Sequence, residues 1–414
     1  MVRLSLSFYK YLFSFRKNRT FMNTLLLVSR PSHHTNLALL KEKDSSPLEF
    51  RVSHPTQIGD IHKGVVLDIQ KNLGFAFVDF GEKTPGLLSR PPSFWENTPF
   101  TKGSSVLVQI TRDKVKHTPL NEQQEEKEKN VRLSLTLSFS SAFFIFQPKT
   151  PGLRFSKTIS KQDFSEETLS KISELLSDNE GLTVKPLARK ASFEALEADL
   201  STLKNLWTLL QEKNKDSKPG LLLPEKEYLF RYILQNSDSL KKIIVDDAAL
   251  YLSLKKFLEV SHLSSFITLT SHLSLTEGPL FEKYDIQERW DLQKDPIIPL
   301  SSGHLILEKT SAFWVFDVNS SSEGTSKKNL DPFQLNTLAG QRILEEIRLK
   351  NLGGTIVVDL IPIQSPSQRK KLLTLLQKQA QEDPLQTHVH NISSLGLCEI
   401  TRPKKEPSFL DLIL

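Results

Sequence analysis

The segments AFWVFDVN (residues 312–319) and GGTIVVDLIPI (residues 353–363) decide the fold of the last third of the chain. Each is a short apolar run rich in β-branched and aromatic residues, which predicts a buried strand. A helical pattern fills residues 336–351 between them, and a second helix is predicted over residues 367–382. Together with a strand at HLILEK (residues 304–309), this alternation of strands and helices predicts an α/β layer structure.

Each of the two segments carries an aspartate where its apolar run ends, Asp317 and Asp359. Ligands of α/β sheets bind beyond the carboxyl ends of the strands, so both carboxylates are expected to reach one crevice. Such a carboxylate pair is a suitable site for Mg²⁺, which lowers the pKa of a bound water and neutralises negative charge on a phosphodiester. Asn319 is predicted on the same strand face as Asp317. The alternative is that each aspartate only caps the turn or helix that follows it.

The N-terminal half contains short β-runs separated by glycine turns, between residues 59 and 110, which predict a small closed barrel. Phe75 and Phe77 share a strand face, whereas Phe80 faces the other way. With basic residues nearby, Lys63 among them, such aromatic side chains can bind single-stranded nucleic acid by stacking and phosphate contact. The alternative, equally weighted, is that the phenylalanines are core residues.

Other periodic segments complete the expected element order. MNTLLLVS (residues 22–29) and residues 48–52 predict strands, and residues 118–130 predict a solvated loop. VRLSLTLSF (residues 131–139) alternates strictly and predicts one half-buried strand. Residues 192–213 predict a long amphipathic helix, and residues 214–220 a boundary loop.

Composition and charge limit the function classes. The 414 residues leave room for two to four domains, and the single cysteine, Cys398, excludes an internal disulfide framework, a four-cysteine zinc site and an iron–sulfur cluster. The formal net charge is +6, but residues 1–21 contain five basic and no acidic residues, so a chain starting at Met22 carries only +1.

Residues 1–21 form a basic leader with the composition of a mitochondrial or plastid transit peptide. The favoured alternative is an upstream start codon, with synthesis beginning at Met22. No apolar run approaches the ~20 residues of a membrane span.

With these pieces in order, the chain resembles the ribonuclease E/G family over residues 22–407. The matching stretches are GDIHKGVVLDI, AFVDFGEKTPGLL, EALEADL, GPLFEKYDIQ, FDVNS, EIRLKNLGGTIVVDLIPI and HNISSLGLCEITR. IRLKNLGGTIVVDLI together with FDVNS is the most specific pair.

The resemblance implies a multidomain α+β and α/β architecture. It divides the chain into an RNase H-like subdomain (22–55 with 219–276), an S1-type OB-fold barrel inserted in it (56–115), a 5′-sensor-like domain (131–218), a DNase I-like catalytic subdomain (277–407) and a tail (408–414). The implied reaction is Mg²⁺-dependent endonucleolytic cleavage of single-stranded RNA, with Mn²⁺ as an alternative ion. The products carry 5′-phosphate and 3′-hydroxyl ends, in RNA processing, rRNA maturation or mRNA decay.

By the same resemblance, Asp317 and Asp359 match the magnesium-binding catalytic aspartates, and Asn319 matches the asparagine beside them. Phe77 matches the stacking phenylalanine of the barrel, and Lys129 a basic RNA contact. The resemblance also implies a homodimer in the bacterial cytoplasm, or in a mitochondrion or plastid if residues 1–21 are a transit peptide.

The chain departs from the family pattern at several positions. Leu87 stands where the family has a second barrel phenylalanine, and Lys185-Pro186 replaces the Arg-Thr pair that holds an RNA 5′ phosphate. Pro362 replaces an acidic residue, and the arginines after FDVNS are absent, with Lys327 and Lys328 as candidate substitutes.

The cysteine pair of the family's zinc link is also absent, so zinc is not expected. Because the sequence ends at Leu414, a long scaffold tail for degradosome-type assembly is not expected either. These departures motivate an alternative function, an RNA-binding protein of the same fold that has lost catalysis.

Overall fold

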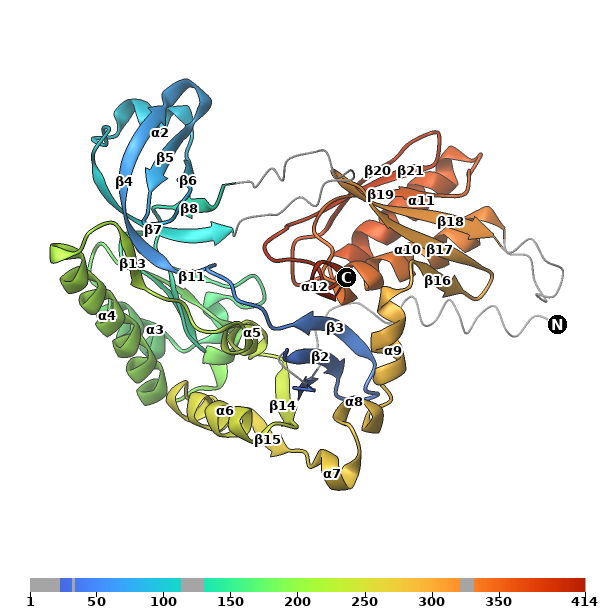
Figure 1. Ribbon diagram of the computed structural model, residues 1–414, viewed down its shortest axis with the longest axis horizontal. Coiled ribbons are helices and arrows are strands. Elements are labelled where there is room, and N and C mark those ends of the chain that lie inside the picture. The colour runs from blue at the N-terminus through green and yellow to red at the C-terminus, as the bar shows by residue number, and fades with distance from the viewer. Residues whose placement is uncertain (1–22, 32–33, 113–129, 321–330, 414) are drawn as a thin grey trace.

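The computed structural model of the protein describes residues 23–31, 34–112, 130–320 and 331–413. Their strands form four sheets. The barrel and the C-terminal sheet lie on opposite sides of the molecule in Figure 1, with the N-terminal sheet below and between them. No helix among the described residues is long and apolar enough to cross a membrane.

The N-terminal sheet joins the start of the chain to a segment some two hundred residues later. Its strand order is β15-β14-β1-β2-β3, in which β1 and β14 pair in parallel. The strands are β1 (Thr24–Ser29), β2 (Asn36–Lys41), β3 (Pro47–Val52), β14 (Leu240–Val245) and β15 (Thr268–Ser271). The sequence prediction missed β2, because NLALLK follows polar turn residues directly. Helices α5 (Tyr228–Asn236) and α6 (Ala248–Val260) contribute to the same core.

The second sheet is a five-stranded closed barrel, as predicted. Its order is β4-β5-β6-β8-β7, and pairing of β4 with β7 closes it. The strands are β4 (Ile61–Gln70), β5 (Phe75–Asp79), β6 (Gly86–Ser89), β7 (Ser105–Arg112) and β8 (Arg132–Ser134), with η1 (Lys71–Leu73) and α2 (Pro92–Asn97) in the connections. A sixth strand, β13 (Gly220–Leu223), pairs with the first residues of β4, Ile61 to Lys63, which precede the residues that pair with β5.

The prediction of one strand over residues 131–139 is wrong. Val131 and Leu133 lie in the barrel core, whereas Leu137 and Phe139 lie in the core of the next sheet. The alternation therefore predicted which side chains are buried, but the chain leaves the barrel between them. The boundary predicted at residue 115 is wrong as well, because β8 belongs to the barrel.

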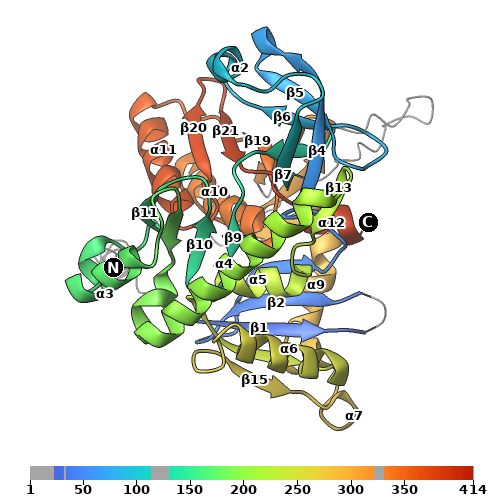
Figure 2. The same ribbon diagram turned by 90° about the vertical axis from the view of Figure 1, so that its left-hand side faces the viewer.

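The third sheet is small and has the order β11-β12-β10-β9. Its strands are β9 (Phe139–Ser140), β10 (Phe144–Gln147), β11 (Gly152–Phe155) and β12 (Gly181–Val184). The surrounding helices are η2 (Lys161–Asp163), α3 (Glu166–Glu174), η3 (Pro186–Lys190) and α4 (Phe193–Asp216). Helix α4 contacts β10 and β13, and thus links this sheet to the barrel (Figure 2).

The C-terminal sheet has six strands in the order β16-β17-β18-β19-β21-β20. They are β16 (Ile297–Leu300), β17 (Gly303–Lys309), β18 (Phe313–Ser320), β19 (Gly354–Asp359), β20 (His388–Ile392) and β21 (Leu397–Arg402). Helices α10 (Pro332–Leu349) and α11 (Pro366–Ala380) bury their apolar side chains against one face of the sheet. The predicted strand–helix alternation is confirmed.

Short helices connect the N-terminal and C-terminal sheets: α7 (Ser274–Glu277), α8 (Leu280–Lys283), α9 (Gln287–Asp291) and η4 (Leu292–Lys294). The segment predicted as a tail forms α12 (Phe409–Ile413), and its Phe409 is buried in a core shared with β3, α8 and α9. The end of the described chain is therefore part of the packed structure.

Candidate active site

The segment IRLKNLGG forms the connection that positions β19. Helix α10 ends at Leu349, and Asn351 adopts a left-handed conformation (φ 53°), a common way to terminate a helix. Gly353 lies so close to Lys404 that a Cβ would be 2.8 Å from the Cα of that residue, and Gly354 has φ +106°. Both glycines are therefore required where the chain turns into the strand.

The polar residues of this segment form ion pairs and hydrogen bonds with other parts of the protein. Lys350 and Glu346 form an ion pair of 2.6 Å in which each side chain is 1% exposed. Asn351 accepts a hydrogen bond from Arg402 and donates one to the carbonyl of Pro407. Arg348 pairs with Glu49 of β3 at 3.1 Å, which connects the two sheets. The basic residues of the motif are thus structural.

The two aspartates lie side by side. Strands β18 and β19 are parallel, and Asp317 is the direct partner of Asp359 in their register. Residues in register on neighbouring strands project from the same face, roughly 5 Å apart. That face is opposite the one covered by α10 and α11, because Phe316, Val318 and Val358 point into the core. Asp317 is half-buried and Asp359 exposed.

The carboxylates do not cap helices. Asp331 caps α10 and Ser365 caps α11, so the alternative of paired caps is wrong for both helices. Asp317 also lies within β18, which continues to Ser320, and does not end it as predicted. Asn319 lies on the predicted face, and its side-chain amide donates a hydrogen bond of 2.8 Å to Asp317. This contact orients the carboxylate.

Asn336 is a buried polar residue beside the candidate site that was not predicted from the sequence. Its side chain, fully buried in α10, donates 2.7 Å to the carbonyl of Ile361 and accepts 3.0 Å from the N–H of the same residue. It thereby fixes the backbone two residues after Asp359. The available signal was a polar residue on the apolar face of the predicted helix.

The RNA-binding residues predicted in the barrel are not all brought together. Phe75 and Phe77 are half-buried on the outside of β5, with ring centroids 5.4 Å apart, whereas Phe80 is fully buried. Lys63 lies toward the other end of β4, and its Nζ donates 2.8 Å to the carbonyl of Asn214 in α4. Lys129, Lys327 and Lys328 lie outside the described residues.

Lys185 is directed into the protein. Its Nζ donates to the carbonyls of Ser141 (2.7 Å) and Leu234 (2.9 Å). Burial lowers the pKa of this ammonium to about 8 against the opposing charges of Asp199 and Asp238. Pro186 begins η3.

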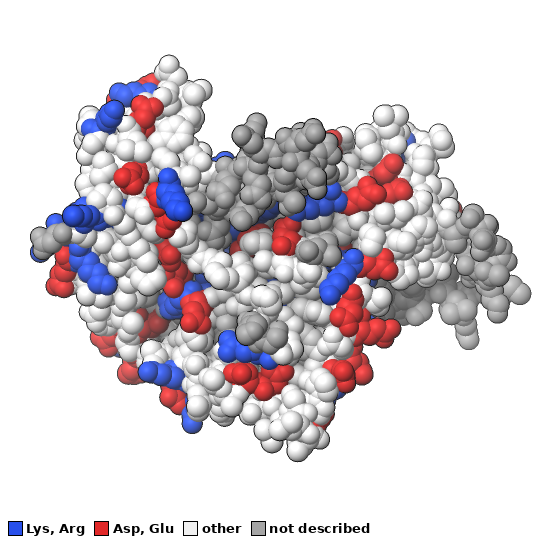
Figure 3. Space-filling view, viewed as in Figure 1, with Lys and Arg blue, Asp and Glu red and all other residues white. Residues whose placement is uncertain are grey.

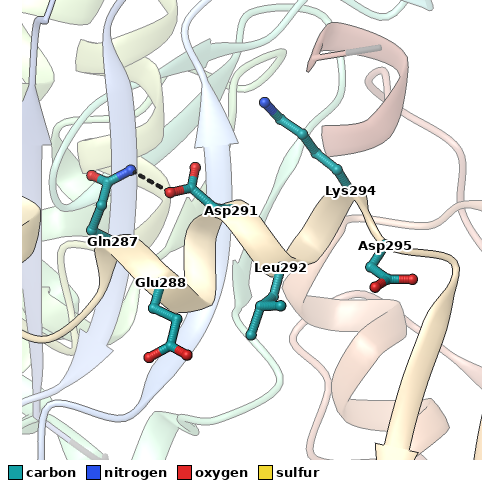
Figure 4. A pocket seen from close by; sticks show the side chains of 6 residues that line it. All are labelled: Gln287, Glu288, Asp291, Leu292, Lys294 and Asp295. Carbon is teal, nitrogen blue, oxygen red and sulfur yellow. Dashed lines mark hydrogen bonds between the residues drawn. The ribbon is translucent and has the colours of Figure 1, made fainter.

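Other surface features lie away from the predicted site residues. On the face shown in Figure 3, basic and acidic side chains are interspersed. A pocket of about 740 Å³ lies on α9 and η4, where Gln287 hydrogen-bonds to Asp291 (Figure 4). None of the predicted site residues lines it. Cys398 is buried in β21, and burial raises the pKa of its thiol to about 12.

The fold and site thus define a mixed α/β protein with a closed barrel and a carboxylate pair on the exposed face of a separate sheet. The sequence model of the ribonuclease E/G family matches residues 138–405. The chain belongs to this family, and the family and the names of its relatives indicate an endoribonuclease.

Three relatives illustrate the range of similarity. Ribonuclease G of Salmonella typhimurium (strain SL1344) is 26% identical over 373 residues, which cover 85% of this chain and 73% of that protein. The putative ribonuclease E of Buchnera aphidicola subsp. Baizongia pistaciae is 28% identical over 357 residues, 83% of this chain and 85% of that protein. Ribonuclease E of Escherichia coli (strain K12) is 25% identical over 418 residues, 94% of this chain but 37% of that protein.

Proposed function

We propose that the chain cleaves single-stranded RNA endonucleolytically in a Mg²⁺-dependent reaction that leaves 5′-phosphate and 3′-hydroxyl ends. The observation that carries this proposal is the pairing of Asp317 with Asp359, in register on the sheet face away from the helices. In a family of ribonucleases, a carboxylate pair on an accessible sheet face is the best candidate for the catalytic site.

The donor set fits Mg²⁺. This ion prefers oxygen ligands and commonly uses one or two carboxylates while keeping waters and binding substrate phosphates. Asp317 and Asp359 supply two carboxylates. Bound there, Mg²⁺ would acidify water and neutralise charge on the phosphodiester. Mn²⁺ accepts similar ligands.

The chain's own residues would orient the reaction. Asn319 keeps the carboxylate of Asp317 in one orientation, and Asn336 holds the backbone after Asp359. A water oxygen forms the new bond to phosphorus, and the bond from phosphorus to the 3′ oxygen breaks. That oxygen leaves with a proton as the 3′ hydroxyl, and the phosphate stays on the 5′ end of the other fragment.

The test uses a single-stranded RNA with a fluorescent 5′ label, incubated with the full chain in Mg²⁺ and then with EDTA. We expect cleavage that EDTA stops and that Asp317→Asn abolishes. Glu308→Gln is the matched control, because it removes one charge on neighbouring β17, opposite Val315, which lies two residues before Asp317. This variant is expected to cleave at the wild-type rate.

The alternative of an RNA-binding protein without catalysis predicts a gel shift and no product at long times. Cleavage that persists in Asp317→Asn would contradict the proposed site. The assignment of the sheets to S1-type, 5′-sensor-like, RNase H-like and DNase I-like subdomains belongs to the same proposal. So do the role in RNA processing, the homodimer and the bacterial cytoplasm as its location.

A further inference from the structure

Strand register places four side chains in a row on the outside of the barrel. Phe77 of β5 is paired with Leu87 of β6, Leu87 with Arg132 of β8, and Arg132 with Arg112 of β7. The residues before and after the first three of them point into the barrel core, so the row faces outward. We call Phe77, Leu87, Arg132 and Arg112 the barrel row. In Figure 1, β6 and β8 lie on the side of the barrel toward the C-terminal sheet.

The two arginines oppose each other across an irregular strand pair. The register shifts between Ile110 and Arg112, so Thr111 and Arg112 both lie opposite Arg132, and the Thr111 hydroxyl donates 3.1 Å to the carbonyl of Arg132. Such β-bulges re-aim side chains and are frequent beside functional sites. Arg132 is exposed and Arg112 half-buried.

The charges of this pair are not balanced by the described protein. Among the residues that the structure describes, no acidic side chain forms an ion pair with Arg112 or Arg132. Burial, and next the charge of Arg132, lower the pKa of the Arg112 guanidinium. Like charges directly opposite each other destabilise a strand pair. Anionic groups bound at the two guanidinium groups would offset this repulsion.

The neighbours of the pair indicate which anion it would take. Guanidinium groups bind phosphate oxygens through two parallel hydrogen bonds. Phe77, two strands away in the same row, offers a ring on which a base can stack. Leu87, between them, has no π-face, but an arginine plane can stack on an unpaired base. The barrel row therefore combines base and phosphate contacts along one line.

We propose that Arg112 and Arg132 bind consecutive phosphodiester groups of single-stranded RNA while a base of the same strand stacks on Phe77. The inference rests on the proposed function for the identity of the ligand. It concerns binding alone and requires no cleavage. In this arrangement, Arg132, which lies next to Leu87, contacts an RNA phosphate, whereas an aromatic ring at position 87 would stack on a base.

The experiment measures the affinity of the full chain for a labelled uridine oligomer of about 12 nucleotides. It uses fluorescence anisotropy in EDTA at several salt concentrations. Each phosphate contact on a single strand contributes about 0.7 to the slope of log K against log salt. We therefore expect the slope to fall by about 0.7 in Arg132→Ala and by about 1.4 in the double variant Arg112→Ala/Arg132→Ala. Arg132→Lys is expected to retain the slope and to bind more weakly, because it keeps the charge but loses the fork.

Lys102→Ala is the matched control, because Lys102 is an exposed basic residue in the turn before β7, at the end of this strand away from Arg112. It should leave slope and affinity unchanged. The melting temperature without RNA should not fall in the double variant, since the substitutions remove a repulsion. The inference is overturned if the double variant keeps the wild-type slope and an affinity within about twofold. A lowered melting temperature combined with a wild-type slope would show that the pair is only structural, which also overturns it.

Failure of the proposed function has a different signature. If the wild type and its variants bind RNA with the expected salt slopes but the wild type never cleaves RNA in Mg²⁺, the barrel-row inference is supported and the proposed catalytic function is contradicted. If the wild type does not bind the oligomer at all, the barrel-row inference falls.

Discussion

The C-terminal sheet and the small sheet of β9–β12 use their predicted functional side chains in opposite ways. In the C-terminal sheet, Asp317 and Asp359 project from the face that the helices leave uncovered, and Asn319 donates a hydrogen bond to Asp317. Beside the small sheet, the ammonium of Lys185 donates to two main-chain carbonyls and is directed into the protein. The aspartates were predicted from their place in the strands and from the family resemblance, and Lys185 from the resemblance alone; the aspartates keep their charge free for a ligand, whereas Lys185 does not.

A retained charge therefore does not by itself preserve a ligand-binding site. A carboxylate on an exposed sheet face can bind a ligand without loss of packing. A buried lysine that donates two of its three N–H groups to carbonyls has at most one left for a phosphate. Turning the ammonium outward would break those bonds, and leaving a buried acceptor unpaired costs about 1–3 kcal/mol. Lys185 thus keeps the charge of the family's arginine and serves the fold.

The largest effect on cleavage is expected from substituting one of the two paired aspartates. Asp359→Asn should lower the cleavage rate by about 10²–10³-fold, the scale for losing a preorganised group that stabilises developing charge. The measurement is the single-turnover rate at saturating RNA and Mg²⁺, with RNA affinity in EDTA as control. Unchanged affinity with a lost rate would place the effect on the chemical step, whereas a wild-type rate would contradict the role of Asp359.

Asn336→Ala should have a smaller effect, about tenfold on cleavage, because the backbone after Asp359 loses both hydrogen bonds at Ile361. Stability should fall by about 1–3 kcal/mol from the unpaired backbone groups. The informative readout is the Mg²⁺ concentration for half-maximal activity, which should rise while RNA affinity in EDTA is unchanged.

Thr337→Ala provides the comparison for Asn336→Ala, since its hydroxyl donates within the same helix to Phe333. A lowered melting temperature with the wild-type Mg²⁺ dependence would show that Asn336 is structural only.

The buried ammonium should affect stability through pH. The folded-state pKa of Lys185 is lowered to about 8 from 10.5, so between these values the unfolded chain holds the proton more strongly than the folded chain. The stability of the wild type relative to Lys185→Met should therefore rise with pH, by about 1 kcal/mol from pH 8 to pH 9. Chemical denaturation at both pH values gives the difference, and parallel stability curves would disprove the assignment.

The smallest effect concerns the RNA 5′ end. Because the Lys185 ammonium is bound to carbonyls and Pro186 has no N–H, an RNA with a 5′ monophosphate should be cleaved at a rate within about twofold of the same RNA with a 5′ hydroxyl. Competition between the two substrates in one reaction measures this ratio directly. A large ratio would show that this region still binds the phosphate.

The sequence predicted the C-terminal sheet well because its signals are local. Apolar runs marked β18 and β19, and an aspartate in each run marked the site. The parallel register that brings Asp317 opposite Asp359 was only implied, since it depends on how α10 packs against the sheet. Asn336 was missed because its partner, the backbone of Ile361, is 25 residues away.

Other expectations failed where a long-range contact decides the outcome. Strict alternation over residues 131–139 identified the buried side chains, but it cannot show that they enter two different cores. Lys63 was grouped with the barrel phenylalanines by sequence proximity, and its RNA contact stays a prediction; in the structure its Nζ donates to the carbonyl of Asn214 in α4, 151 residues later. IRLKNLGG belongs to the stretch that most specifically resembles the family, and its Lys350 and Asn351 maintain the helix-to-strand connection.

The closure of the barrel by β8 has a practical consequence for expressing parts of this protein. A fragment that ends at residue 115 lacks Leu133 in its core and leaves the edges of β6 and β7 open to other chains. Extending it to residue 134 restores both, but Gln109 then loses its hydrogen bonds to Ser138. A fragment that ends just beyond Ser138 is therefore the shortest that retains every one of these contacts, and it is the one to choose for isolated binding or NMR work.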